Sequence, residues 1–206
     1  MLFPLLLLLS LRILYVFRQI RISRGSSTGA HQLVRDCGRL LTVAGSGGHT
    51  AELIQLLKGV RHVFSSHHCL VADTDPMSNS KVREMDPSVK ISVIPRAREV
   101  GQSYLSSVWT TLRSLVWSVP AVVCARPDML LVTGPGTCIP VCVLVLVLRV
   151  AGVCRGRIVF AESICRVQTL SLSGKILLLF ADHVIVQWDS LHKKYPSSTY
   201  IGRVVS

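Results

Sequence analysis

The stretch "LLTVAGSGGHTAELIQLL", residues 40–57, decides the fold of this chain. Its first five residues form a short apolar run that is typical of a buried strand, and residues 50–57 repeat apolar positions at helical spacing. Three glycines and a histidine lie between these two segments. Glycine-rich turns from a strand into a helix commonly hold a phosphate, because backbone N–H groups and the positive helix end point at the anion.

The remainder of the chain continues this alternation. Strands bounded by Gly or Pro and separated by helices predict a parallel sheet that is covered on both faces. We therefore expect an α/β fold, a single Rossmann-like doubly wound domain over residues 39–206, with no internal repeat. The further expected strands are 69–73, 90–95, 129–134, 157–162 and 183–187, and the further expected helices are 102–124 (broken near Pro120), 139–152 and 171–180.

Residues 139–153 allow two interpretations. The segment "IPVCVLVLVLRVAGV" is apolar enough for a second membrane span, or for a helix buried under the sheet. It is shorter than the ~20 residues that a span requires, and it contains Arg149. These two features favour the buried helix.

The head of the chain, "MLFPLLLLLSLRILYVFRQIRISRGS", begins with an apolar run interrupted by Arg12. A cleaved signal peptide is the alternative to a membrane anchor. The positive charge follows the apolar run and no A-x-A-like site is present, which favours an uncleaved anchor. Because positive residues mark the cytosolic side, Arg18, Arg21 and Arg24 place the rest of the chain in the cytosol. We predict a single-pass anchor at 1–23 with a basic flank and a linker at 24–38.

The charge distribution indicates which kind of partner the chain binds, and the cysteine content indicates the state of its thiols. The net charge is +12, and residues 1–39 hold six arginines against Asp36 alone. This asymmetry favours an anionic membrane surface, and no nucleic-acid motif is recognisable. The seven cysteines are odd in number and form no CxxC, so we expect reduced thiols, no metal and no cofactor. Cys138 and Cys142 share a helix face, but no second ligand pair lies near them in sequence.

Three loops follow strands and should meet at the carboxyl edge of the sheet, where such folds bind ligands. They are "AGSGGHT" (44–50), "TGPGTC" (133–138) and "AESICR" (161–166). Purely structural roles are the alternative: the glycines relieve crowding, His49 bonds to its neighbours, and Glu162 pairs with Arg166. The residues predicted to bind a diphosphate are Gly45, Ser46, Gly47, Gly48, Thr50, Gly134, Gly136 and Thr137.

The first loop is no P-loop, because no Gly-Lys-Ser/Thr follows it. It is close to a dinucleotide fingerprint, with Thr50 where Gly or Ala is usual, and Asp73 ends the second strand where a ribose-binding acid belongs. An oxidoreductase that uses NAD is therefore an alternative.

Six ordered motifs together resemble one known family over roughly residues 40–206. The chain resembles the membrane-anchored subunit of the two-chain UDP-N-acetylglucosamine transferase of dolichol-linked oligosaccharide synthesis. That family is related to the acceptor half of the bacterial lipid-precursor N-acetylglucosaminyltransferase. The motifs are "VAGSGGHTAELIQLL", "VADTDPMS", "IPRAREVGQS", "TGPGTCIP", "AESICRVQTLSLSGKIL" and "VQWDSL".

The resemblance implies the N-terminal, acceptor-side half of a split GT-B fold, inactive alone, with a soluble partner subunit that carries most of the UDP-GlcNAc site. The heterodimer adds the second GlcNAc to GlcNAc-diphosphate-dolichol on the cytosolic face of the endoplasmic reticulum. His49 is then the candidate base or diphosphate partner, and Glu162 orients it or binds acceptor hydroxyls. Ile201, Val204 and Val205 are expected to dock on the partner. The alternative within this family is a scaffold that only recruits the partner to the membrane.

Overall fold

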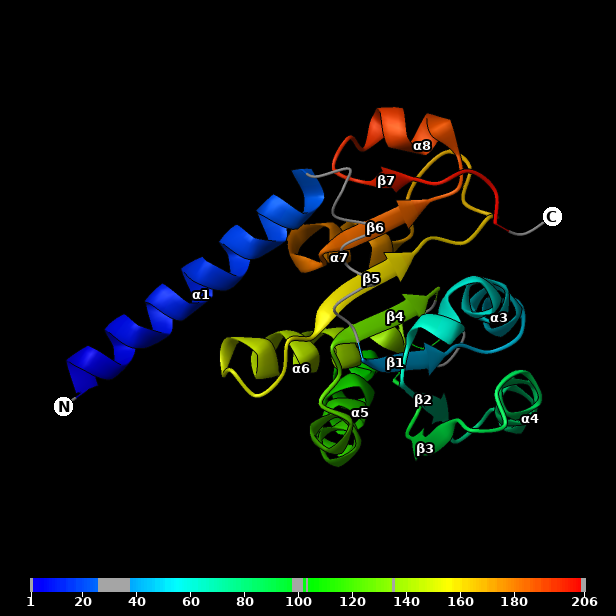
Figure 1. Cartoon of the computed structure of the whole chain (residues 1–206), viewed down its shortest axis with the longest axis horizontal. Helices are drawn as coiled ribbons and strands as arrows, with labels where there is room; N and C mark the ends of the chain where they lie inside the picture. Colours follow the sequence, from blue (N-terminus) through cyan, green and yellow to red (C-terminus); the bar gives the residue numbers. More distant parts are fainter. Residues whose placement is uncertain (1, 26–37, 98–101, 103, 135, 205–206) are drawn as a thin grey trace.

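A computed structural model describes residues 2–25, 38–97, 102, 104–134 and 136–204, and its strands form one parallel sheet. The strand order is β3-β2-β1-β4-β5-β6-β7, so the winding reverses between β1 and β4 (Figure 1). This order confirms the doubly wound fold and puts its switch point beside the first glycine loop. The strands are β1 Arg39–Ala44, β2 Ser66–Ala72, β3 Lys90–Ile94, β4 Met129–Thr133, β5 Arg157–Ala161, β6 His183–Val186 and β7 Thr199–Tyr200.

Helices cover both faces of this sheet (Figure 1). One face packs against α3 and α4, and the other packs against α5, α6 and α7. The helices are α1 Leu2–Gly25, α3 Gly48–Val60, α4 Pro76–Met85, α5 Tyr104–Ala125, α6 Cys138–Val150, α7 Leu172–Phe180 and α8 Asp189–Lys194, with a 3-10 turn η1 at Arg61–Val63.

The central strands β1, β4 and β5 are buried over nearly their whole length because each face meets a helix layer. In β1, Leu41 and Val43 belong to the core under α5–α7, whereas Leu40 and Ala44 belong to the core under α3 and α4. All four side chains are at most 2% exposed. Tight packing therefore fixes the position of β1, whose carboxyl end leads directly into the first glycine loop.

The predicted elements are confirmed apart from their ends and a few short additions. The 139–153 segment is a core helix, since α6 buries Val141, Cys142 and Val145 completely. The sequence analysis missed α4, α8 and β7. The last of these has only two residues, which pair with Ile185 and Val186 of β6, too few for a periodic pattern to be detected.

The expected break near Pro120 is wrong. Helix α5 continues through Pro120 to Ala125. A proline in a helix removes the bond to the carbonyl four residues earlier, here that of Val116. Val116 and Pro120 are both exposed on the outer side of α5, so the bond is lost on the exposed side of the helix.

Helix α1 extends over Leu2–Gly25 and lies beside α6 (Figure 1). Most of the expected linker, 24–38, lies outside the described residues. By length and composition, the helix in the described part that could cross a membrane is α5, over Ser107–Ala125. The anchor predicted at 1–23 stays a prediction.

Candidate functional site

A polar pocket of about 490 Å³ lies at the carboxyl edge of the sheet, and all three predicted loops line it. Gly48 and His49 come from the loop after β1, Gly134 and Gly136 from the loop after β4, and Glu162 from the loop after β5. These residues are far apart in sequence, and the parallel sheet brings them together. Residues that the sequence analysis did not single out complete the lining: Glu52, Ser163, Cys165, Ser171, Leu172 and Ser173, together with Arg166.

The first loop is shaped by buried hydroxyl groups. Gly47 precedes α3 with a φ of 63°, a left-handed value that glycine adopts without strain. The Thr50 hydroxyl donates to the Gly45 carbonyl, and Ser78 Oγ donates to the same oxygen at 3.1 Å. Thr50 is completely buried. Its hydroxyl therefore holds the loop in shape rather than facing the pocket.

Ser46 and Asp73 both accept hydrogen bonds from Arg96. Arg96 Nη2 donates to Ser46 Oγ at 3.0 Å, and the backbone N–H of Arg96 donates to Asp73 Oδ1 at 3.2 Å. Asp73, the acid expected to bind ribose in an oxidoreductase, thus ties β2 to the end of β3. Neither Ser46 nor Asp73 lines the pocket in the described residues.

The second loop fits closely against His49. Gly134 has a φ of 71°, and a Cβ placed on it would lie 2.1 Å from His49 Nδ1. The Thr133 hydroxyl donates to the backbone carbonyl of His49 at 3.0 Å. Thr137 precedes α6, is 5% exposed and does not line the pocket. Gly134 therefore leaves the space in which the imidazole lies.

Glu52 holds the His49 ring. Its Oε2 lies 3.4 Å from His49 Nδ1, while its Oε1 accepts hydrogen bonds from Ser163 Oγ at 2.7 Å and from the Ile164 N–H at 3.1 Å. Nδ1 faces Glu52, and among the described residues Nε2 of the ring has no hydrogen-bond partner. The signal for Glu52 was present in the sequence, because a residue three positions further along a helix lies on the same face.

Glu162 lines the pocket next to the start of α7, and its expected role in catalysis stays a prediction. Its side chain is 1% exposed, and its carboxylate accepts from the Ser171 N–H (2.8 Å), the Ser171 hydroxyl (2.9 Å) and the Ser163 N–H (3.2 Å). Ser171 in turn caps α7 by accepting from the Gly174 N–H. Glu52, not Glu162, contacts His49, and within the described residues Glu162 forms no ion pair with Arg166. Glu162 fixes the start of α7.

Three helices begin around the pocket. Gly48 and His49 open α3, Gly136 precedes α6 by two residues, and Leu172 and Ser173 open α7. Each helix start carries a positive partial charge and unpaired N–H groups. Arg166 adds a full positive charge to the lining. The helix starts and Arg166 offer donor groups to an anion, while the carboxylate oxygens of Glu52 and Glu162 accept bonds from Ser and backbone donors of the protein.

The expected partner-binding tail lies beside β7 at the sheet edge. Ile201 is 45% exposed, and the N–H of Val204 donates to Gln187 Oε1 at 3.1 Å. The Arg203 guanidinium lies over the Trp188 ring, 4.4 Å from its centre. Val205 lies outside the described residues. Ile201 also lines an apolar cavity of about 200 Å³ on the sheet face beside α3.

Among solved structures, a crystal structure of MurG from Acinetobacter baumannii is similar to this chain. The TM-score is 0.58 and the sequence identity 15%, over 80% of this chain and 45% of the MurG chain. The chain therefore spans less than half of that protein. At this identity the similarity supports the fold alone.

Sequence comparisons are more specific. The family described as "Oligosaccharide biosynthesis protein Alg14 like" matches residues 40–204. A Homo sapiens protein named UDP-N-acetylglucosamine transferase subunit ALG14 is 47% identical over 83% of this chain and 85% of its own length. Proteins of the same name from Mus musculus (46%, over 85% of this chain and 87% of the relative) and Candida albicans (35%, over 98% and 93%) also match. The chain thus belongs to the Alg14-like family of oligosaccharide biosynthesis proteins.

Proposed function

We propose that this chain is a subunit of a UDP-N-acetylglucosamine transferase and supplies the acceptor side of its active site. In the proposed reaction, the second GlcNAc passes from UDP-GlcNAc to GlcNAc-diphosphate-dolichol at the cytosolic face of the endoplasmic reticulum. The relatives' name, transferase subunit, supports both the enzyme class and the need for a partner. The family assignment favours this function over the NAD-dependent alternative.

The observation that carries the proposal is the pocket where three helix starts meet one histidine. A diphosphate carries negative charge on several oxygens, and the N–H groups at helix starts are suited to bind it. The glycines at 48 and 136 let a ligand approach the backbone closely. We assign these groups and Arg166 to the acceptor diphosphate.

His49 is the proposed general base. Sugar transfer breaks the bond between the sugar carbon and UDP, forms a bond from that carbon to the acceptor oxygen, and releases the acceptor hydroxyl proton. His49 Nε2 can accept this proton while Glu52 holds Nδ1. A carboxylate beside the distal nitrogen keeps the ring oriented and stabilises the imidazolium that forms.

The donor side of the cleft is assigned to a separate soluble subunit. We propose that the tail of this chain docks on it, with Ile201, Val204 and Val205 as contacts. The exposed side chain of Ile201 at the sheet edge supports this assignment. Deleting residues 204–206 should weaken co-purification of the two subunits, and unchanged co-purification would contradict this docking role.

Reconstitution tests the proposal. Membranes that contain this chain, the partner or both are supplied with UDP-GlcNAc and a lipid-linked GlcNAc-diphosphate. We expect transfer only when both chains are present, and loss of transfer when His49→Ala replaces the wild type with the partner still bound. Full transfer by the partner alone would reject a role for this chain in the active site. Transfer that requires this chain but survives His49→Ala would leave it as a recruitment scaffold.

A further inference from the structure

The loop after β5, residues 162–168, forms one wall of the candidate active site, and we call it the pocket loop. It contains no helix or strand, so its backbone depends on other contacts for its position. Whatever holds this backbone therefore also holds a wall of the pocket. The members of the loop that line the pocket are Glu162, Ser163, Cys165 and Arg166.

Four backbone carbonyls of the pocket loop accept hydrogen bonds from side chains of one short stretch, which runs from the end of β6 through α8. This stretch includes the motif "VQWDSL" (186–191), to which the proposed function gives no role. Residues 187–194 therefore hold the backbone of the pocket loop in place. The bonds run from Gln187 Nε2 to Glu162 O (3.3 Å), Trp188 Nε1 to Ile164 O (2.7 Å), Ser190 Oγ to Val167 O (3.1 Å) and Lys194 Nζ to Gln168 O (3.2 Å).

Trp188 is connected to His49 through two further residues. The carbonyl of Ile164 accepts from Trp188, and the N–H of Ile164 donates to Glu52 Oε1 at 3.1 Å. The other oxygen of Glu52 lies 3.4 Å from His49 Nδ1. A shift of Ile164 would therefore move the carboxylate that orients the imidazole.

Gln187 acts on the same carboxylate by a second route. It donates to the carbonyl of Glu162, which belongs to the peptide group of Ser163. Ser163 Oγ in turn donates to Glu52 Oε1 at 2.7 Å. Gln187 is 4% exposed, so water has little access to its bonds. Two neighbouring side chains, Gln187 and Trp188, thus hold the two loop residues that hold Glu52.

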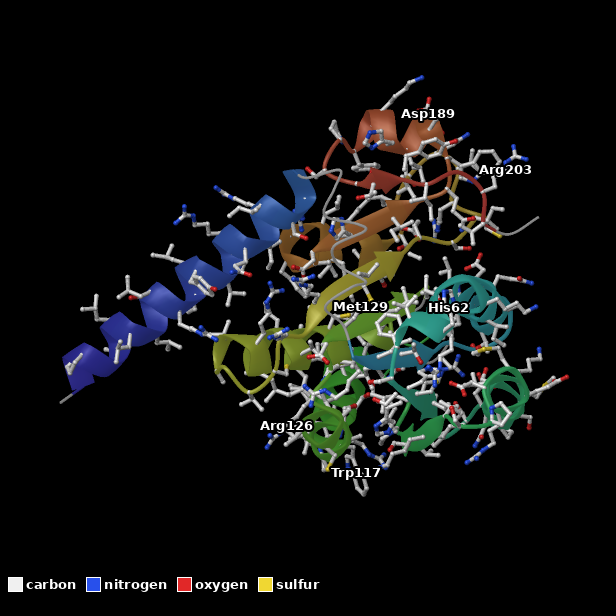
Figure 2. The ribbon with its side chains drawn as sticks, in the orientation of Figure 1. His62, Trp117, Arg126, Met129, Asp189 and Arg203 are labelled. Carbon is white, nitrogen blue, oxygen red and sulfur yellow. The ribbon has the colours of Figure 1, made fainter. Side chains whose placement is uncertain are left out.

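The tail of the chain contacts the opposite ends of these two side chains. The N–H of Val204 donates to Gln187 Oε1 at 3.1 Å. The Arg203 guanidinium lies over the Trp188 ring, 4.4 Å from its centre. Figure 2 shows Arg203 on the same side of the domain as Asp189, the first residue of α8. Gln187 and Trp188 therefore each join the tail to the pocket loop.

We propose that Gln187 and Trp188 are positioning residues for His49, and that the tail acts on the active site through them at Arg203 and Val204. The tail then has two roles: it docks on the partner subunit, and it orients the base. This second role rests on the proposed function, in which His49 is the base, whereas the contacts themselves do not. Docking of the partner and orientation of His49 are linked by one chain of contacts.

Trp188→Phe tests the link to the pocket loop. The variant keeps a ring for Arg203 but removes the N–H that bonds to Ile164. With the partner saturating and its binding verified, kcat should fall about tenfold, less than the roughly 100-fold loss that a 1 Å displacement causes. The KM for UDP-GlcNAc should not change, because the partner binds the donor. Wild-type kcat in this variant would overturn the proposal.

Trp117→Phe is the matched control. Trp117 is 62% exposed on α5 and points away from the domain (Figure 2). The same change of side chain at this position should leave kcat at the wild-type value. An equal loss of kcat in Trp117→Phe and Trp188→Phe would show that the loss does not come from the bond to Ile164, and it would overturn the proposal.

A double-mutant cycle separates positioning from a general loss of structure. Arg203→Gln removes the cation from the Trp188 ring and should lower kcat about threefold. In the Trp188→Phe background the same substitution should have no further effect on kcat, because the ring no longer bonds to the pocket loop. Two independent structural defects would multiply their losses, and this result would overturn the proposal.

Gln187→Glu separates the two roles of the tail. It keeps the oxygen that accepts from Val204 but puts a second oxygen against the Glu162 carbonyl. Co-purification with the partner should be unchanged, while kcat should fall. An unchanged kcat would leave docking as the single role of the tail.

Amide hydrogen exchange on the full chain alone tests the contacts without UDP-GlcNAc or the partner. Trp188→Phe should speed exchange in residues 162–168 and leave the loop at 133–138 unchanged, because the bonds that are lost hold the pocket loop only. Unchanged exchange in 162–168 would overturn the proposal. A failure of the proposed function would instead appear as unchanged transfer by His49→Ala, so the two failures are distinguishable.

Discussion

The two edges of the sheet both suit an anion, but they do so with different groups. At the carboxyl edge, helix starts and glycines surround His49, and the buried carboxylates of Glu52 and Glu162 accept bonds from the protein. At the amino edge, arginine side chains line a cavity around Arg12. Anion binding at the carboxyl edge would depend on backbone positions that close packing fixes. Anion binding at the amino edge would depend on the charge of long side chains.

This difference determines which substitutions each edge of the sheet tolerates. A backbone site fails when one atom is added in the wrong place, because close-packed neighbours have nowhere to move. A cluster of guanidinium groups loses affinity gradually as charges are removed. Substitutions at the carboxyl edge should therefore have steep effects on turnover, and those at the amino edge should have smaller effects on stability and membrane binding.

The largest expected effect is that of Gly134→Ala. The new Cβ would lie 2.1 Å from His49 Nδ1, at a backbone φ of 71°, so the imidazole must move. Displacing a catalytic group by about 1 Å costs roughly 100-fold in rate. We expect this loss in kcat of the two-subunit enzyme, with the partner still bound. Gly59→Ala is the control, because no heavy atom of the described residues lies within 4 Å of its Cβ position. Wild-type turnover by Gly134→Ala would show that His49 need not occupy this place.

The second prediction separates the two carboxylates. Glu162→Gln puts an amide where the Ser163 and Ser171 donors now point, so unfolding free energy should fall by about 2 kcal/mol. Glu52→Gln keeps an acceptor for Ser163 but removes the charge beside His49. It should lower kcat about tenfold with a smaller change in stability. Denaturant unfolding and turnover measured on both variants check this contrast, and equal effects on both quantities would contradict it.

The third prediction concerns pH and the amino edge, where β2 and β6 begin. Burial lowers the pKa of His67, even though contact with Asp86 acts in the opposite direction, and burial also lowers the pKa values of His68 and His183. The unfolded chain therefore binds these protons at higher pH than the folded chain does. Stability should be complete above pH ~6.5 and fall as the pH decreases below that value.

Urea unfolding between about pH 7.5 and 5 measures this loss. His67→Gln should flatten the dependence, whereas His62→Gln, at an exposed position, should leave it unchanged. A pH-independent unfolding midpoint in the wild type would show that these histidines are not held neutral by burial.

The smallest expected effect is that of Arg39→Gln. Arg39 Nε lies 3.2 Å from Asp128 Oδ2, but the arginine side chain is 46% exposed. Partly exposed pairs contribute at most about 1 kcal/mol. Thermal unfolding should show a loss of about 0.5 kcal/mol and no change in kcat. A loss several times larger would indicate that the amino edge is packed as closely as the carboxyl edge.

The fold was predictable because its central strands are mostly apolar on both faces and two of them, β1 and β4, end in glycine loops. The place of each loop followed from the rule for parallel sheets, and the structure brings Gly48, His49 and Glu162 to one pocket as expected. The side-chain partners did not follow from the sequence. Which carboxylate reaches His49 depends on how Ser163 and Ser171 orient Glu52 and Glu162, and these contacts form between distant segments.

The sequence also did not predict that only the second half of α1 packs against the domain. The apolar run indicates a membrane helix, but its periodicity does not show that Val16 and Ile20 are buried against the domain. Thr50 is a similar case: it belongs to the first glycine loop and was expected to bind a diphosphate, yet it is completely buried and its hydroxyl donates to the Gly45 carbonyl.

The central claim is that the carboxyl-edge pocket forms half of an active site. The most direct test measures transfer to a water-soluble, short-chain GlcNAc-diphosphate acceptor, so that membrane binding no longer affects the rate. The partner is saturating, and its binding to each variant is verified. His49→Ala should lower kcat about 100-fold. Unchanged turnover would contradict the claim and leave this chain as the membrane scaffold of an active site located elsewhere.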